Sequence, residues 1–127
     1  MARKFIMIAA VSGFLAVVIG AFAAHGLKQL LPAEVIETVK TGVQYQFYHT
    51  FALGFVGLWL MHKPGVSGLK AAGLAFILGI LLFSGSLYAL ALGAPRWLGP
   101  VTPLGGICFL LGWLAIFAAA LRTHSGE

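Results

Sequence analysis

The fold is decided by residues 71–92, which read AAGLAFILGILLFSGSLYALAL. This run contains no charged residue, and its length matches the roughly 17–25 residues that an α-helix needs to cross a bilayer. Transmembrane strands would be about half as long and would alternate polar with apolar residues. Because residues 71–92 do neither, they predict a membrane-spanning helix.

Three further apolar runs of similar length lie outward from this one, at residues 5–24, about 43–61 and about 104–121. The chain of 127 residues is 61% hydrophobic and 9% charged, whereas soluble domains carry about 25% charged residues. No linker or low-complexity stretch divides it. The sequence therefore predicts an all-α integral membrane protein with a single domain over residues 1–127, built as a bundle of four transmembrane helices.

The first run also resembles a secretory signal peptide, because Arg3 and Lys4 precede it and it ends in the small-residue string Ala21-Phe22-Ala23. Its apolar core of about 20 residues exceeds the roughly 7–15 of a signal peptide. We therefore expect it to be retained as the first spanning helix.

The positive-inside rule predicts the orientation of the four spans. With the N-terminus in the cytoplasm, basic residues in the cytoplasmic segments outnumber those outside, which predicts that both termini lie in the cytoplasm. The net charge of +5 is interpreted as this topology signal, because a nucleic-acid surface would be larger and clustered. The inside set is Arg3, Lys4, Lys63, Lys70 and Arg122, and the outside set is Lys28, Lys40 and Arg96.

The connection between the first two runs predicts an amphipathic helix. Pro32 can open a helix, and the apolar residues Val35, Ile36, Val39 and Val43 then recur at spacings of three and four. The pattern leaves two arrangements open, because the helix can lie on the outer membrane surface or run directly into the second span. The other two connections are short and rich in turn residues, which predicts that the helices they join pack side by side in antiparallel directions.

Polar side chains from all four spans are expected at a similar depth. At a rise of about 1.5 Å per residue, His49 and Ser84 both lie roughly 18–20 Å from the cytoplasmic ends of their helices. We therefore predict an outer-leaflet polar layer in which His49 approaches Ser84 or Tyr88. Three interpretations remain open: mutual hydrogen bonding that fixes helix register, a site for a small molecule, lipid headgroup or ion, and a proton-handling or catalytic site. The predicted layer contains His25, Tyr45, His49, Ser84, Ser86, Tyr88 and Thr102.

Small residues recur on each span and predict close helix packing, because lipid gives helices no hydrophobic drive to associate. Packing within one chain explains most of them, and an interface between copies of the chain can use the others. The predicted packing residues are Gly13, Gly20, Gly85, Ala89, Gly93, Gly105 and Gly112.

Catalytic, metal and cofactor chemistry are poorly supported. The spans contain no Asp, Glu, Lys or Arg, and two candidate imidazoles, His25 and His49, are weak evidence for a metal. The single cysteine, Cys108, is expected to be a buried structural thiol. We expect no enzyme and no cofactor. The leading hypothesis is a structural or accessory membrane protein acting through a homo-oligomer or a partner membrane protein, and the alternative is a binder or transporter of a small molecule, lipid or ion.

Four ordered motifs resemble the bacterial domain-of-unknown-function family 423, the YgdD and YwdK type. They are residues 20–27 (GAFAAHGL), 45–49 (YQFYH), 83–88 (FSGSLY) and 102–106 (TPLGG), so the resemblance spans nearly the whole chain. It departs at Ala23, where members often carry glycine. The resemblance implies a small four-helix inner-membrane protein whose biochemical function is not established, and it assigns no catalytic residue.

Overall fold

The computed structural model describes residues 1–124, and every regular element in that range is helical. This confirms the all-α class. The elements in chain order are α1 (Ala2–Ala24), α2 (Gly26–Leu30), α3 (Ala33–His62), α4 (Leu69–Gly79), the π-helix η1 (Ile80–Ser84), α5 (Gly85–Ala91), the 3₁₀ helix η2 (Arg96–Leu98) and α6 (Val101–His124).

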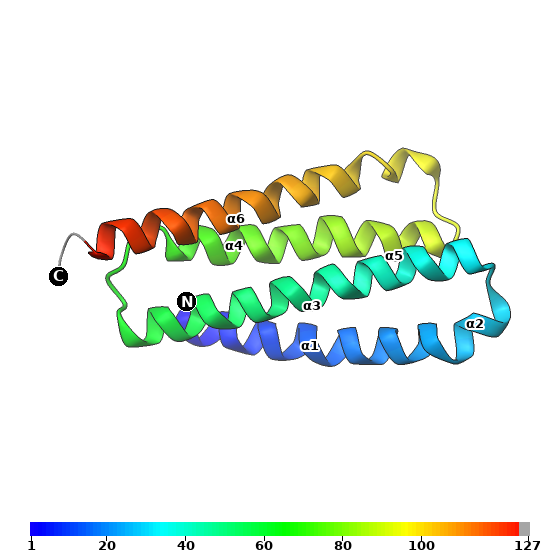
Figure 1. The fold of residues 1–127 in the computed structure, drawn as a ribbon, viewed down its shortest axis with the longest axis horizontal. Helices are drawn as coiled ribbons and strands as arrows, with labels where there is room; N and C mark the ends of the chain where they lie inside the picture. The colour runs from blue at the N-terminus through cyan, green and yellow to red at the C-terminus, as the bar shows by residue number, and fades with distance from the viewer. Residues whose placement is uncertain (125–127) are drawn as a thin grey trace.

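The long helices lie lengthwise beside one another as two hairpin pairs (Figure 1). Helix α1 packs on α3, and α6 packs on α4 and η1. The two pairs meet where α3 contacts α4, η1 and α5. The first turn of α1 and the last turn of α6 lie at the same end of the molecule, opposite α2 and η2 (Figure 1). Helix α3 is therefore the shared central element.

Three segments are long and apolar enough to cross a membrane: Ala2–Ala24, Leu69–Ala91 and Arg96–Thr123. They correspond to the first, third and fourth runs of the sequence. Helix α3 contains the second run and has 30 residues, but it carries more polar side chains and does not fall in this set. Its polar positions Gln46, His49 and Thr50 are buried among the other helices.

The segment expected to form an amphipathic helix is the beginning of α3. Of the two arrangements left open by the sequence, the structure has the continuous one, because α3 runs without a break from Ala33 to His62. Pro32 precedes its first residue, as expected for a residue that suits a helix start. The separate helix before it is α2, a short turn over Gly26–Leu30 that the sequence pattern did not predict.

Aromatic rings packed against glycines hold the helices together, both within and between the two helix pairs. At four buried glycines an added Cβ would lie between 2.3 and 2.6 Å from a ring carbon, closer than real Cβ contacts allow. Any side chain there would displace the ring, so each glycine is needed for the observed helix spacing. The ring and glycine pairs are Phe5 with Gly73, Tyr88 with Gly42, Phe109 with Gly79, and Phe76 with Gly112.

Several predicted packing residues lie at helix contacts. An added Cβ would lie 3.6 Å from Thr50 at Gly13 and 3.3 Å from Val43 at Gly20. Gly105 makes the closest backbone approach, with its Cβ position 2.3 Å from the backbone nitrogen of Phe83.

Gly85 and Gly93 do not make the close helix contacts that the sequence predicts. Ala89, the third predicted packing residue of this region, is partly buried on α5. At Gly85 and at Gly93 an added Cβ meets no atom within 4 Å. Gly93 instead has φ 98°, a left-handed conformation that suits the chain as it leaves α5. These two glycines therefore leave space rather than bring helices together.

Candidate functional site

Two grooves run along opposite sides of the contact between the helix pairs. The two pairs meet mainly through α3 and the α4–η1–α5 segment, and one groove lies on each side of this contact. The first groove, of about 310 Å³, lies between α1 and the α4–η1–α5 segment. The second, of about 640 Å³, lies between α3, η1 and α6. We call them the aliphatic groove and the aromatic groove after the side chains that line them.

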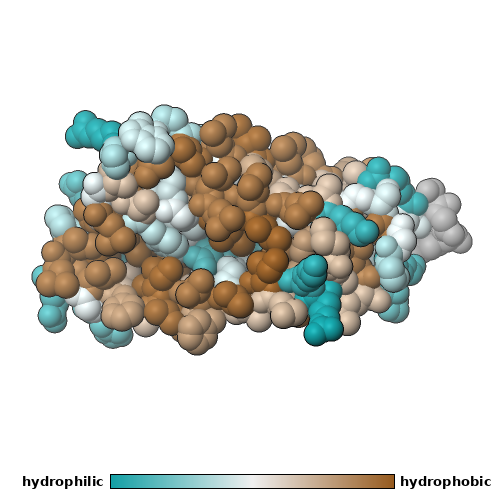
Figure 2. All heavy atoms as spheres, turned by 180° about the vertical axis from the view of Figure 1, so that it is seen from behind, coloured by the Kyte–Doolittle hydropathy of each residue, from teal (hydrophilic) through white to brown (hydrophobic). Residues whose placement is uncertain are grey.

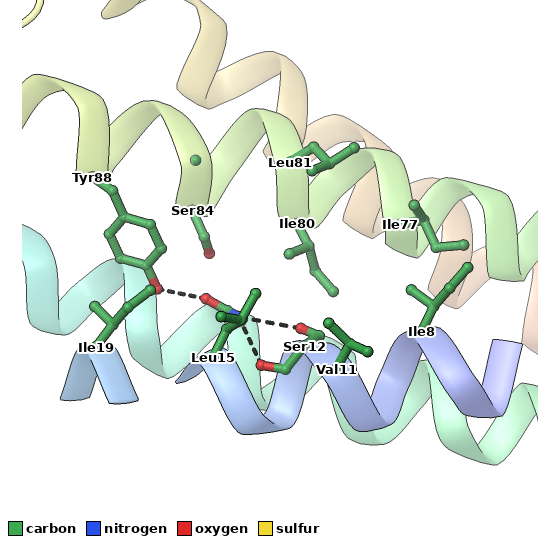
Figure 3. A pocket seen from close by; sticks show the side chains of 12 residues that line it. Ile8, Val11, Ser12, Leu15, Ile19, Ile77, Ile80, Leu81, Ser84 and Tyr88 are labelled. Atoms are coloured by element: carbon green, nitrogen blue, oxygen red, sulfur yellow. Dashed lines mark hydrogen bonds between the residues drawn. The ribbon is translucent and has the colours of Figure 1, made fainter. Parts of the chain in front are cut away.

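A polar network forms the floor of the aliphatic groove. The Tyr88 hydroxyl donates to Gln46 Oε1 at 2.6 Å, and Gln46 Nε2 donates to the Ser12 carbonyl at 2.8 Å. Ser12 Oγ also shares a hydrogen bond of 2.7 Å with Thr50 Oγ1. The network therefore joins α5, α3 and α1. Figure 3 shows the Tyr88 and Ser84 side chains pointing across the groove, and its dashed lines mark the hydrogen bonds that lead from Tyr88 through Gln46 to Ser12.

The surrounding surface is largely apolar. In Figure 2, brown hydrophobic residues cover most of one face, and a smaller pale and teal area interrupts them near the middle. The walls of the aliphatic groove are the branched side chains Ile8, Val11, Leu15, Ile19, Ile77, Ile80 and Leu81.

Neighbouring residues of the π-helix η1 point toward different grooves. Phe83 lines the aromatic groove, whereas the next residue, Ser84, lines the aliphatic groove and is 1% exposed. Ser84 Oγ donates to the Gly42 carbonyl of α3 at 2.7 Å. A π-helical turn leaves α-helical hydrogen bonds unmade, and Ser86 Oγ donates to the Phe83 carbonyl at 2.9 Å. Ser86 also hydrogen-bonds the Thr102 hydroxyl, which links α5 to α6.

Replacing Ser84 by alanine tests the contact between η1 and α3. We expect a loss of about 0.5–1.5 kcal/mol of unfolding free energy, because the variant loses the hydrogen bond to the Gly42 carbonyl. The loss stays small because this carbonyl lies inside α3 and keeps its helical partner. Unfolding in sodium dodecyl sulfate, followed by circular dichroism, measures this loss. Ser67→Ala, in an exposed loop, is the control, and equal stability of the two variants would show that the Ser84 bond contributes nothing.

His49 is held in the wall of the aromatic groove. Its ring stacks on Phe109 with centroids 3.5 Å apart and planes 5° apart. Nδ1 lies 2.7 Å from the Tyr45 carbonyl, and Nε2 accepts a hydrogen bond of 3.1 Å from Trp113 Nε1. The neutral tautomer with its proton on Nδ1 satisfies both contacts. The His49 side chain therefore joins α3 to α6.

The aromatic groove is lined almost entirely by rings. Tyr45 packs on Phe83 with centroids 4.7 Å apart, and Trp113 meets His49 edge to face at 5.9 Å. Tyr45, Tyr48 and Trp113 are 38%, 50% and 46% exposed, so their faces are open to a bound molecule. The full lining is Tyr45, Tyr48, His49, Phe51, Phe83, Gly106, Phe109, Leu110 and Trp113.

The predicted polar layer is thus divided between separate places. The pairing of His49 with Ser84 or Tyr88 is wrong, because both ring nitrogens of His49 bond Tyr45 and Trp113 instead. Ser84 and Tyr88 bond α3 on the side of the aliphatic groove, and Ser86 bonds Thr102. His25 is exposed at the junction of α1 and α2, where it lines a shallow apolar depression with Phe22.

The sequence analysis did not identify several residues that complete the polar network and the aromatic groove. Ser12 and Gln46 are polar residues within apolar runs, and this feature of the sequence could have identified them as members of the network. Trp113 lies inside a span rather than at its end, which is unusual for an aromatic residue that prefers the interface. Phe109 carries no such signal. Within residues 1–124, no three His, Cys, Asp or Glu side chains come together as a metal site would require.

Comparison with known proteins places the chain in a family. A family model described as a protein of unknown function (DUF423) matches residues 19–106. A UPF0382 membrane protein of Haemophilus influenzae is 40% identical over 125 residues, covering 98% of this chain and 99% of the relative. No solved structure matches the chain.

Two further relatives extend this result to other bacteria. The UPF0382 membrane protein YwdK of Bacillus subtilis is 41% identical over 120 residues, covering 94% of this chain and 98% of the relative. The UPF0382 inner membrane protein YgdD of Escherichia coli is 41% identical over 124 residues, covering 96% of this chain and 93% of the relative. The resemblance drawn from the four sequence motifs is confirmed, and the chain belongs to the DUF423 family of membrane proteins.

Proposed function

We propose that this chain binds a lipid-soluble small molecule in the aromatic groove. The observation that carries the proposal is the groove itself, whose volume of about 640 Å³ falls within the roughly 300–1,000 Å³ of ligand pockets. Its lining of exposed ring faces with a few polar groups also matches the composition of such pockets. The proposed function is binding, and no reaction is assigned to the groove.

The proposal places the chain in a bacterial inner membrane with four spans and both termini in the cytoplasm. Helix α3 is the fourth span in this proposal, because its polar side chains at Gln46, His49 and Thr50 face other helices rather than lipid. The excess of basic residues at the ends of α1 and α6 and in the loop between α3 and α4 supports the orientation.

The test compares compounds that purify with the protein and with two glycine variants. Gly106 lines the aromatic groove, and an added Cβ would lie 4.0 Å from its nearest neighbour, Phe83, so Gly106→Leu is expected to fill the groove without breaking the fold. Gly85→Leu is the matched control, because Gly85 lines the aliphatic groove and an added Cβ there meets no atom within 4 Å. Mass spectrometry of organic extracts then measures what each protein carries.

We expect one compound to purify with the wild-type protein and with Gly85→Leu, and to be depleted from Gly106→Leu at equal protein yield. Identical extracts from all three proteins would contradict the proposed function.

A second candidate function is an accessory role in complex with a second copy or another membrane protein. The small size of the chain and the small residues that recur on its spans support it, and Ser12, Gln46 and Tyr88 use their polar groups on one another rather than on a ligand. Native mass spectrometry in mild detergent tests this role. A defined oligomer or a bound partner is the expected result, and a strictly monomeric protein without partners would count against it.

A further inference from the structure

The aromatic groove has features that select one class of lipid-soluble ligand. We propose that it takes the ring of a quinone-type lipid, meaning a neutral planar ring with carbonyl oxygens and a long apolar tail. This inference rests on the proposed function, because it names the ligand of the same groove.

The first argument is the contrast between the two groove walls. An acyl chain gains dispersion energy from any apolar wall, and branched aliphatic side chains form the wall of the aliphatic groove. The aromatic groove instead presents tyrosine, phenylalanine and tryptophan rings, and aromatic pairs stack or meet edge to face at centroid distances of about 4.5–7 Å. A planar ring gains these contacts from the aromatic groove, whereas a saturated chain does not.

The second argument is the supply of hydrogen-bond donors. The Tyr45 hydroxyl makes no hydrogen bond within the described part of the chain, and Tyr48 accepts one from Gln44, which leaves its own proton to donate. Both phenols belong to residues that line the groove. A hydroxyl donor without an acceptor costs free energy in hydrocarbon, so these phenols favour a ligand with carbonyl acceptors.

The other polar groups of the groove are already occupied. Trp113 Nε1 donates to His49, and His49 Nδ1 contacts the Tyr45 carbonyl, so this pair holds the wall in place. Asp, Glu, Lys and Arg are absent from the lining side chains. A charged headgroup would therefore find no partner there, whereas a neutral ring requires none.

The third argument is the direction of access. Phe51 and Leu110 line the groove and are 72% and 64% exposed, so it opens sideways between α3 and α6. In the proposed membrane placement this opening faces lipid. A ligand tail can remain in the bilayer while the ring enters the groove, and only the ring must match the site.

The experiment uses Trp113 as a reporter, because it lies in the groove. Trp59→Phe and Trp97→Phe leave it as the single tryptophan of the full-length chain in nanodiscs of phosphatidylethanolamine and phosphatidylglycerol. The probes are a prenylated naphthoquinone, decyl-benzoquinone, and the isoprenoid alcohol phytol, which has a tail without a ring. Fluorescence quenching by each quinone, with phytol as the competitor, measures occupancy.

We expect saturable quenching by at least one quinone, no competition by phytol, and loss of saturation in Gly106→Leu but not in Gly85→Leu. Tyr45→Phe is expected to weaken binding about 5–10-fold, as the loss of one hydrogen bond would. If Gly106→Leu folds poorly, Leu110→Trp takes its place, because it blocks the same opening. Binding to this variant is measured by competition against a fluorescent quinone analogue.

Linear quenching that is equal in Gly106→Leu and Gly85→Leu would overturn the inference, because it reports only quinone dissolved in the lipid. Equal competition by phytol would also overturn it. A compound without a quinone ring that is depleted by Gly106→Leu in the extraction experiment would refute the ligand class while leaving the proposed function standing.

Discussion

A methyl group added at Gly105 is expected to destabilise the folded protein by about 3 kcal/mol, at the upper end of overpacking costs. The Cβ of Gly105→Ala would lie 2.3 Å from the backbone nitrogen of Phe83 and 2.8 Å from its Cα. A ring could rotate away, but here the obstacle is backbone. The substitution must therefore push η1 away from α6.

The shift of η1 has a second expected consequence, because Phe83 lines the aromatic groove and the Gly105 clash acts on its backbone. Unfolding in sodium dodecyl sulfate measures the stability, and near-ultraviolet circular dichroism measures the change around the aromatic rings. Gly106→Ala is a matched control one residue along α6, since its Cβ would lie 4.0 Å from the nearest atom. Equal stability of the two variants would contradict the close contact between α6 and η1.

Replacing Gln46 by leucine is expected to cost about 2 kcal/mol and to loosen α1 from α3. Gln46 accepts from Tyr88 and donates to Ser12, so leucine removes both connections and leaves the Tyr88 hydroxyl without its acceptor. Interhelical hydrogen bonds in membranes average only about 0.6 kcal/mol each, and an unmet buried hydroxyl adds about 1–3 kcal/mol.

Gln44→Leu is the control for this prediction, because Gln44 lies on α3 as well but is exposed and bonds only within its own helix, to Tyr48. A double-mutant cycle between Gln46→Leu and Tyr88→Phe isolates the bond between the two side chains. Equal stability of Gln44→Leu and Gln46→Leu, or no coupling in the cycle, would show that the network does not hold the helices.

The helical class and the position of the long helices follow from the sequence, because apolar runs of spanning length can form little else in lipid. The rise per residue predicts that His49 and Ser84 lie at one depth, but Ser84 bonds the Gly42 carbonyl of α3, whereas His49 packs against Phe76 of α4. The partners of each helix face were not predictable: Ser84 and Tyr88 share the aliphatic groove, as their spacing of four predicts, but they bond Gly42 and Gln46 rather than His49. The hydrophobic pattern of residues 80–84 does not signal a π-helix.

Helix spacing was predictable only in part, because a glycine can serve opposite purposes. Gly105 allows a close backbone approach, whereas Gly85 faces open space, and the two look alike in the sequence. Gly42, which receives the Tyr88 ring, lies before the second apolar run and was not singled out. The grooves depend on which helices these contacts bring together, so they became visible only in the assembled fold.

Both grooves and both proposals depend on α3 crossing the bilayer as the central helix. Cysteine labelling at the two ends of α3 tests this most directly, in a Cys108→Ala background, using the exposed positions Glu34 and Lys63. A membrane-impermeant maleimide is expected to label Glu34→Cys in spheroplasts and Lys63→Cys only after the membrane is opened. Labelling of both positions from the same side would contradict the account.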